Sequence, residues 1–75
     1  MNAPWSEFPD LPRGSLGWRM GAGEAYLDQF IEWLYQQGES GVSDYIFNNP
    51  PPEEWQNLFD YHLEKMRVGK GPWEF

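Results

Sequence analysis

Three consecutive prolines at positions 50–52 precede the most regular hydrophobic pattern in the chain. A proline ring fixes φ and removes a backbone N–H, so a helix can begin at Pro52 but cannot extend back through it. The large residues that follow recur with the 3.6-residue period of an amphipathic helix: Trp55, Leu58, Phe59, His62, Leu63 and Met66. Gly69 is suited to end such a helix, so the pattern predicts a helix over residues 52–68.

A second hydrophobic pattern predicts a helix over residues 23–37. Its members have the i, i+3, i+4, i+7 spacing of a helix face that packs in a core: Leu27, Phe30, Ile31 and Leu34. Gly38 is expected to end this helix in the left-handed conformation. A short helix over residues 40–48 is predicted to follow, because Ser40 is a favoured N-cap residue and Asn49 precedes a proline.

The composition favours helices over strands. The chain has only four β-branched residues, two isoleucines and two valines, and strands are enriched in such residues. At 75 residues it is expected to be a single domain (residues 1–75) with one modest core, and without cysteine that core has no disulfide to support it. We therefore predict an all-α fold, a small bundle of two long helices and one short helix.

The two ends of the chain are expected to lack regular helices. Residues 1–16 contain three prolines and are predicted to form an extended arm. Trp5, Phe8 and Leu11 recur every third residue, so they would share one edge of a polyproline helix. We expect that edge to pack on the helices; docking on a partner is the alternative. Residues 69–75 are predicted to form an irregular tail whose aromatics fold back on the helices; a frayed tail is the alternative.

Residues 17–23 are predicted to form a glycine-rich turn before the first long helix. Glycine permits positive φ or close backbone approach, and such a turn at a helix N-terminus can hold phosphate. The spacing of Gly17, Gly21 and Gly23 matches neither common phosphate-binding motif, and Glu24 would repel an anion. A small-ligand or nucleotide site at the Gly17–Glu24 turn is retained as an alternative function.

No catalytic constellation is recognisable. Nucleophilic catalysis requires a Ser or Cys beside a positioned base, and the only imidazole, His62, falls on the apolar face of its helix. One histidine without cysteine makes a structural zinc site unfavourable. The net charge of −7 disfavours direct nucleic-acid binding. We therefore expect no enzymatic activity, no cofactor, no metal and no direct contact with nucleic acid.

The acidic residues have an unusual distribution. From Glu24 to Glu64 the chain has nine acids and no lysine or arginine. Glu24, Asp28 and Glu32 are four residues apart and would form one stripe on the predicted helix 23–37. Like charges at this spacing cost a helix about 0.2–0.5 kcal/mol per pair. The stripe is interpreted as a surface for a basic partner; a simply solvated face is the alternative.

These patterns lead to a hypothesis about function. We expect a non-enzymatic protein-binding domain that inhibits or regulates a basic partner, which could itself bind nucleic acid. The candidate partner-binding residues are Glu24, Asp28, Glu32, Trp33, Tyr35, Asp60 and Glu64. In size and charge alone the chain is similar to small acidic inhibitors from phages and mobile elements, including DNA mimics and anti-CRISPR proteins.

An alternative of another class is a small structural or assembly protein that self-associates through surface aromatics. The chain has fourteen aromatic residues, which could exceed what its core can bury. A monomer or a homodimer is expected accordingly. No apolar run reaches the roughly 20 residues of a membrane span, and a cytoplasmic location is expected.

Overall fold

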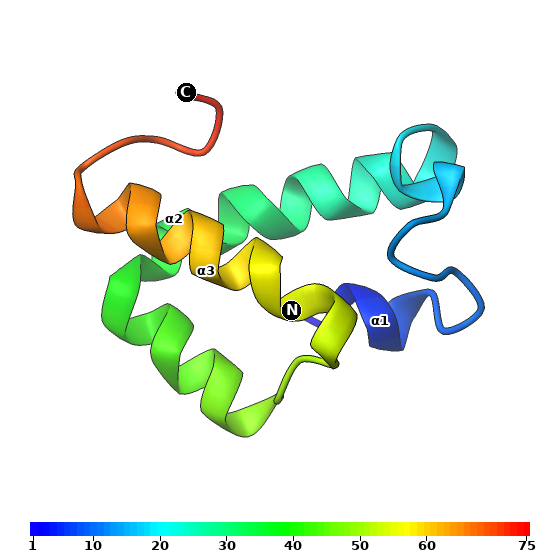
Figure 1. Ribbon diagram of the computed structural model, residues 1–75, viewed down its shortest axis with the longest axis horizontal. Coiled ribbons are helices and arrows are strands. Elements are labelled where there is room, and N and C mark those ends of the chain that lie inside the picture. Colours follow the sequence, from blue (N-terminus) through cyan, green and yellow to red (C-terminus); the bar gives the residue numbers. More distant parts are fainter. The chain divides into compact units, whose positions relative to one another are not determined.

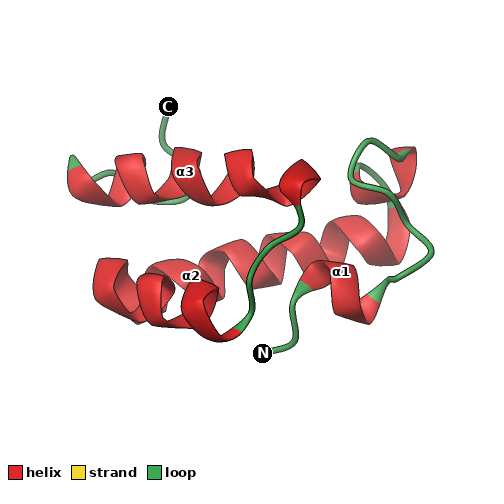
Figure 2. Cartoon of the chain, turned by 60° about the horizontal axis from the view of Figure 1, so that its bottom comes forward, coloured by secondary structure: helices red, strands yellow, loops and turns green.

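The computed structural model describes residues 1–75, and every regular element in it is helical (Figure 1). The order is α1 (Pro4–Glu7), the 3₁₀ turn η1 (Leu16–Trp18), α2 (Gly21–Asn48) and α3 (Glu53–Arg67). No strand is present (Figure 2), so the predicted all-α class is confirmed. The chain divides into two compact units, unit 1 (Met1–Trp33) and unit 2 (Leu34–Phe75), and their boundary falls within α2.

In unit 1 the N-terminal segment packs on the first turns of α2. The Tyr26 hydroxyl donates to the Asn2 carbonyl at 2.6 Å. The Phe8 ring meets the rings of Trp18 and Tyr26 edge to face, with both pairs of centroids 5.6 Å apart. The arm therefore folds onto the helix, as its aromatic spacing predicted. The buried apolar side chains of unit 1 are Ala3, Pro4, Trp18, Leu27, Phe30 and Ile31.

The prediction of an extended arm is wrong near its start, because Pro4–Glu7 form the single turn of α1. Pro4 occupies the beginning of that turn, where its fixed φ suits a helix and its missing N–H is not needed. The amides of Ser6 and Glu7 donate to the Ala3 carbonyl at 2.9 and 3.0 Å. A three-residue spacing fits a helical turn as well as a polyproline helix, so the sequence pattern could not separate the two.

The glycine-rich turn of residues 17–23 contains η1 and the start of α2, which begins two residues before the predicted position, at Gly21. Trp18 is buried, and its indole N–H donates to the carbonyls of Leu11 and Pro12 at 3.2 and 2.9 Å. Met20, the other large side chain of the turn, is 62% exposed. The turn therefore fixes one large side chain and leaves the other in solvent.

The helix α2 is interrupted at Gly38, which has φ 76° and ψ 174°. The helical segments on either side correspond to the helices predicted over residues 23–37 and 40–48. Gly38 has the expected positive φ, but its ψ is extended rather than left-handed helical, which corrects the predicted cap. This region of φ and ψ is accessible essentially only to glycine. The break therefore depends on the absence of a side chain at this position.

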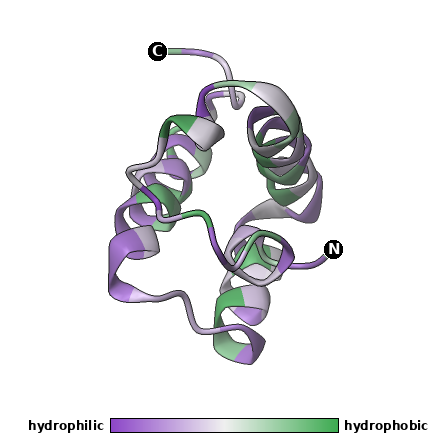
Figure 3. Cartoon of the chain, turned by 90° about the vertical axis from the view of Figure 1, so that its right-hand side faces the viewer, coloured by the Kyte–Doolittle hydropathy of each residue, from purple (hydrophilic) through white to green (hydrophobic).

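In unit 2 the helix α3 is one residue shorter at each end than predicted. Pro52 is its N-cap rather than its first residue, Val68 is its C-cap, and Gly69 follows with φ 80°. The buried apolar side chains of unit 2 are Leu34, Val42, Trp55, Leu58 and Phe59. Hydrophobic and hydrophilic stretches are interspersed along the helices (Figure 3), and in an amphipathic helix the hydrophobic positions recur with a 3.6-residue period.

Candidate functional site

The acidic stripe predicted on the first long helix is exposed in unit 1. The side chains of Glu24, Asp28 and Glu32 all lie on the solvent-facing side of α2. At a rise of about 1.5 Å per residue, residues four apart are separated by about 6 Å along the helix axis. Neither Glu24 nor Asp28 takes part in an ion pair. The negative charges of Glu24 and Asp28 are therefore not offset by direct contact with a lysine or arginine of the chain.

The two aromatic residues predicted as anchors differ in their surroundings. Trp33 belongs to unit 1 and is partly exposed, with its ring stacked on Phe30 at 6.0 Å between centroids. Tyr35 belongs to unit 2, and its hydroxyl lies 2.6 Å from Nδ1 of His62. Burial, and then the neighbouring Tyr61, raise the pKa of Tyr35. Tyr35 therefore makes an internal polar contact, whereas Trp33 keeps an exposed edge beside the stripe.

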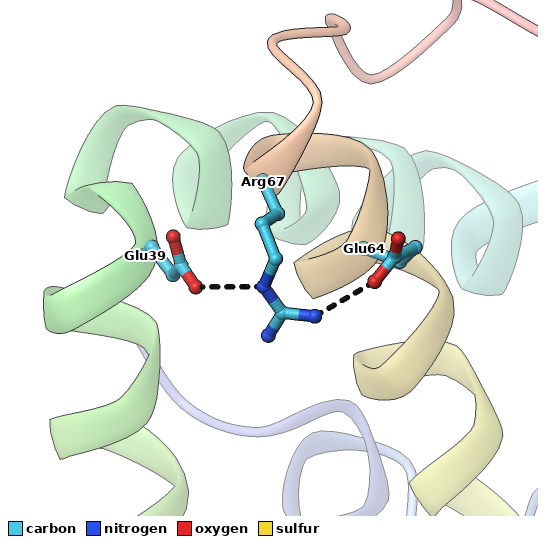
Figure 4. A network of polar contacts seen from close by, with 3 residues as sticks. All are labelled: Glu39, Glu64 and Arg67. Atoms are coloured by element: carbon cyan, nitrogen blue, oxygen red, sulfur yellow. Dashed lines mark hydrogen bonds and ion pairs between the residues drawn. The ribbon is translucent and has the colours of Figure 1, made fainter.

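Two further acids of the predicted site, Asp60 and Glu64, are exposed on α3 in unit 2. The Arg67 guanidinium lies between two carboxylates, donating to Glu64 at 2.7 Å and to Glu39 at 3.3 Å (Figure 4). Arg67 lies in the last turn of α3, and the sequence pattern did not indicate these pairs. Glu64 is thus partly compensated, and Asp60 lies outside the network.

The predicted site residues therefore fall into two groups. Glu24, Asp28, Glu32 and Trp33 belong to unit 1, while Tyr35, Asp60 and Glu64 belong to unit 2. The structure brings the first group together on consecutive turns of one helix. In the second group, Asp60 and Glu64 share one face of α3, while the Tyr35 hydroxyl is directed to His62.

A buried polar cluster in unit 2 was not recognised from the sequence. His62 is only 6% exposed, and its ring meets Tyr35 and Tyr61 edge to face at 5.4 and 5.0 Å. Burial, and then the positive charge of Lys65, lower the pKa of His62 to about 4. The imidazole is therefore neutral at pH 7, in keeping with its predicted position on the apolar face.

Lys65 is the second member of this cluster, and it is 6% exposed. Its Nζ donates to the Pro72 carbonyl at 2.9 Å. The same atom lies 5.2 Å from the Tyr61 ring centroid and 4.9 Å from that of Phe75, within the range of cation–π attraction. The C-terminal tail therefore contacts α3 through the Pro72 carbonyl and the Phe75 ring, although Trp73 and Phe75, which were expected to fold back, are 48% and 93% exposed. The aromatics at positions 61 and 75 were the only sequence signal for a covered lysine.

The glycine turn offers little room for a phosphate. Gly23 is buried against the backbone of Gly17, and Gly17 packs on the Leu11 side chain. These contacts account for the two glycines without a ligand, because any side chain there would collide with its neighbours. An open hollow of about 740 Å³ lies beside the start of α3 and is lined mostly by polar residues.

The structure brings no three His, Cys, Asp or Glu side chains together in a way that could hold a metal ion. None of its helices combines the length and apolar character needed to cross a lipid bilayer. No family model matches the chain, and comparisons with curated proteins and with solved structures give no significant match.

Proposed function

We propose that this protein is a non-enzymatic binding domain that inhibits or regulates a basic protein partner, in the manner of small acidic inhibitors from phages and mobile elements. The observation that carries the proposal is the exposed stripe of Glu24, Asp28 and Glu32 on α2. The net charge of −7 adds a long-range attraction toward a positive surface. A partner that normally binds nucleic acid fits best, because its groove carries the required lysines and arginines.

Energetic considerations support a partner for this stripe. Each like-charge pair four residues apart costs an isolated helix about 0.2–0.5 kcal/mol, and a basic surface would convert that repulsion into attraction. The partly exposed ring of Trp33 adjoins Glu32 in the sequence and supplies apolar area of the kind found at interface anchors. On α3, Asp60 and Glu64 would add a second acidic contact.

The chemistry available to the chain favours binding over catalysis. The only imidazole, His62, is buried beside Tyr35 and Tyr61, and a low pKa keeps it neutral. A general base would have to reach a substrate proton, and a buried ring among aromatic neighbours is poorly placed for that. We propose accordingly that the protein acts by occupying its partner's surface in the cytoplasm.

The proposal is tested by capture from a nuclease-treated cell lysate on the immobilised protein at low ionic strength. The variant D28K/E32K should lose the captured basic protein, because it reverses two charges of the stripe. The variant D44K/E54K makes the same change in net charge at exposed positions of unit 2 and should keep it. Equal capture by all three proteins would rule out recognition through the stripe.

A second candidate function is self-association, and one observation favours it. Several large apolar side chains are exposed, with Phe47 at 84% and Phe75 at 93%. Exposed apolar area of this kind is found at assembly surfaces. Sedimentation velocity at micromolar concentration tests this candidate, because a monomer across the whole range would remove it and leave the acidic binding domain.

A further inference from the structure

The side chains of His62 and Lys65 contact the same aromatic ring. The Tyr61 ring centroid lies 5.0 Å from the His62 ring centroid and 5.2 Å from Lys65 Nζ. Both side chains are almost completely buried. Two positive charges this close in a poorly solvated place repel strongly, because the local dielectric constant is low. The arrangement therefore tolerates a charged lysine only while the histidine stays neutral.

The hydrogen bond between Tyr35 and His62 does not prevent protonation of the ring. When Nδ1 of a neutral imidazole is the acceptor, the Tyr35 hydroxyl donates to it across the 2.6 Å that separate them. When the ring is protonated, Nδ1–H donates to the hydroxyl oxygen instead. The contact survives in both states, so the main consequence of protonation is a new charge beside Lys65.

The charged and titratable groups around His62 come from three segments. From α2 these are Tyr35, in contact with the ring, and Glu39, whose carboxylate pairs with Arg67. From α3 they are Tyr61 and Lys65, together with the Glu64–Arg67 pair, which lies in exposed positions. From the tail, the Pro72 carbonyl and the Phe75 ring contact Lys65.

We propose that His62 and Lys65 form an acid-sensitive latch for residues 71–75 of the tail. When the imidazole gains a proton, the Lys65 ammonium moves away from the Tyr61 ring into solvent. The hydrogen bond to the Pro72 carbonyl and the contact with the Phe75 ring are then lost, and the tail separates from α3. Burial, and then the Lys65 charge, oppose protonation of His62 and lower its pKa, which is consistent with this coupling.

Two further features explain why the tail detaches while α3 stays folded. Trp73 and Phe75 are 48% and 93% exposed and Glu74 is exposed, so the tail buries only part of its aromatic area. Lys65 is in the last turn of α3, where its long side chain can rotate outward without breaking a helical hydrogen bond. Acidification therefore changes the exposure of the C-terminal aromatics while α3 stays folded.

The test is an NMR titration of the full chain from pH 7.5 to 3.5. One set of spectra follows the His62 ring, the amides of residues 71–75 that carry an N–H, the Trp73 indole N–H and the amides of α3. The tail signals should move to the positions of an unstructured peptide with the same midpoint as His62, while the α3 amides stay dispersed. A tail that does not respond when His62 is protonated would overturn the proposal.

Two variants separate this latch from titration of nearby carboxylates. In His62→Gln the side chain still accepts a hydrogen bond from Tyr35 but does not titrate, so the tail should stay bound throughout the range. In Lys65→Met the tail should be detached already at pH 7.5. A transition that persists unchanged in His62→Gln, or loss of the α3 amides at the same pH in the wild type, would contradict the latch. The wild-type comparison of midpoints decides the question even if a variant does not fold.

Discussion

A Cβ atom built on Gly23 would lie 2.1 Å from the carbonyl oxygen of Gly17. No real side chain tolerates such a distance, and the obstructing atom is backbone, which cannot rotate aside. The first turn of α2 and the turn that contains η1 are therefore in direct contact. This contact makes the Gly17–Glu24 stretch a rigid connection.

Gly23→Ala is expected to destabilise the protein. Alanine would gain about 1 kcal/mol over glycine inside a helix, but overpacking typically costs 1–3 kcal/mol, and a backbone obstacle places this site at the upper end. A net loss of about 1–2 kcal/mol should be seen in urea unfolding. Gly14→Ala is the matched control, since a Cβ there meets nothing within 4 Å, and it should be close to neutral. Equal effects of the two substitutions would contradict the packing argument.

The break in α2 gives a stereochemical prediction. Gly38 has φ 76° and ψ 174°, and a Cβ there meets nothing within 4 Å, so any cost of a side chain is conformational. L-alanine at this position should cost about 1–3 kcal/mol. D-alanine, introduced by chemical synthesis, prefers mirror-image angles and should be tolerated. Thermal unfolding of the two synthetic proteins compares them directly, and a D-alanine protein as unstable as the L-alanine one would refute the explanation.

His62 predicts a pH dependence of stability. Its pKa is about 4 in the folded protein against an ordinary value of 6.5, so the unfolded chain binds the proton more tightly. The resulting stabilisation is complete above pH 6.5 and is lost as the pH falls toward 4. Linkage gives a loss of about 3 kcal/mol over that window. The free energies of unfolding of the wild type and of His62→Gln are measured in urea between pH 7.5 and 4. The difference between the two proteins should change by this amount across that range. Parallel curves would show that the pKa of His62 is not lowered in the folded protein.

Arg67→Gln tests the ion pairs of unit 2 and the proposed function together. All three partners are exposed, and such pairs contribute little, so the free energy of unfolding should fall by less than about 1 kcal/mol. The substitution also removes a positive charge from between Glu39 and Glu64. Binding of a polylysine peptide, measured by titration calorimetry at low salt, should therefore become tighter. Weaker binding would indicate that the partner recognises the ordered Glu39–Arg67–Glu64 arrangement rather than the net negative charge of the surface.

The helices were predictable because their signals are local. The period of Trp55, Leu58 and His62, bounded by Pro52 and Gly69, located α3 to within one residue at each end. Gly38 was recognisable as a break because few other residues interrupt a helix so readily. Its ψ was not predictable, since that angle depends on the path of the chain on both sides.

The burial of Lys65 could not have been predicted in the same way. A lysine in the last turn of a helix ordinarily stabilises the helix dipole from solvent. Here its position depends on the tail returning to α3, which is a contact between residues seven apart along the chain. Likewise, the acidic stripe was evident from spacing alone, whereas the compensation of Glu64 by Arg67 emerged only with the side-chain geometry.

The hydrogen bond from Tyr26 to Asn2 also bears on how fast unit 1 assembles. It joins residues 24 positions apart and is the longest-range hydrogen bond described within that unit. The entropy of closing a loop grows only with the logarithm of its length, so this contact adds little to the folding barrier. Helical chains dominated by such short separations fold in microseconds to milliseconds. The arm can therefore dock as soon as the first turns of α2 have formed.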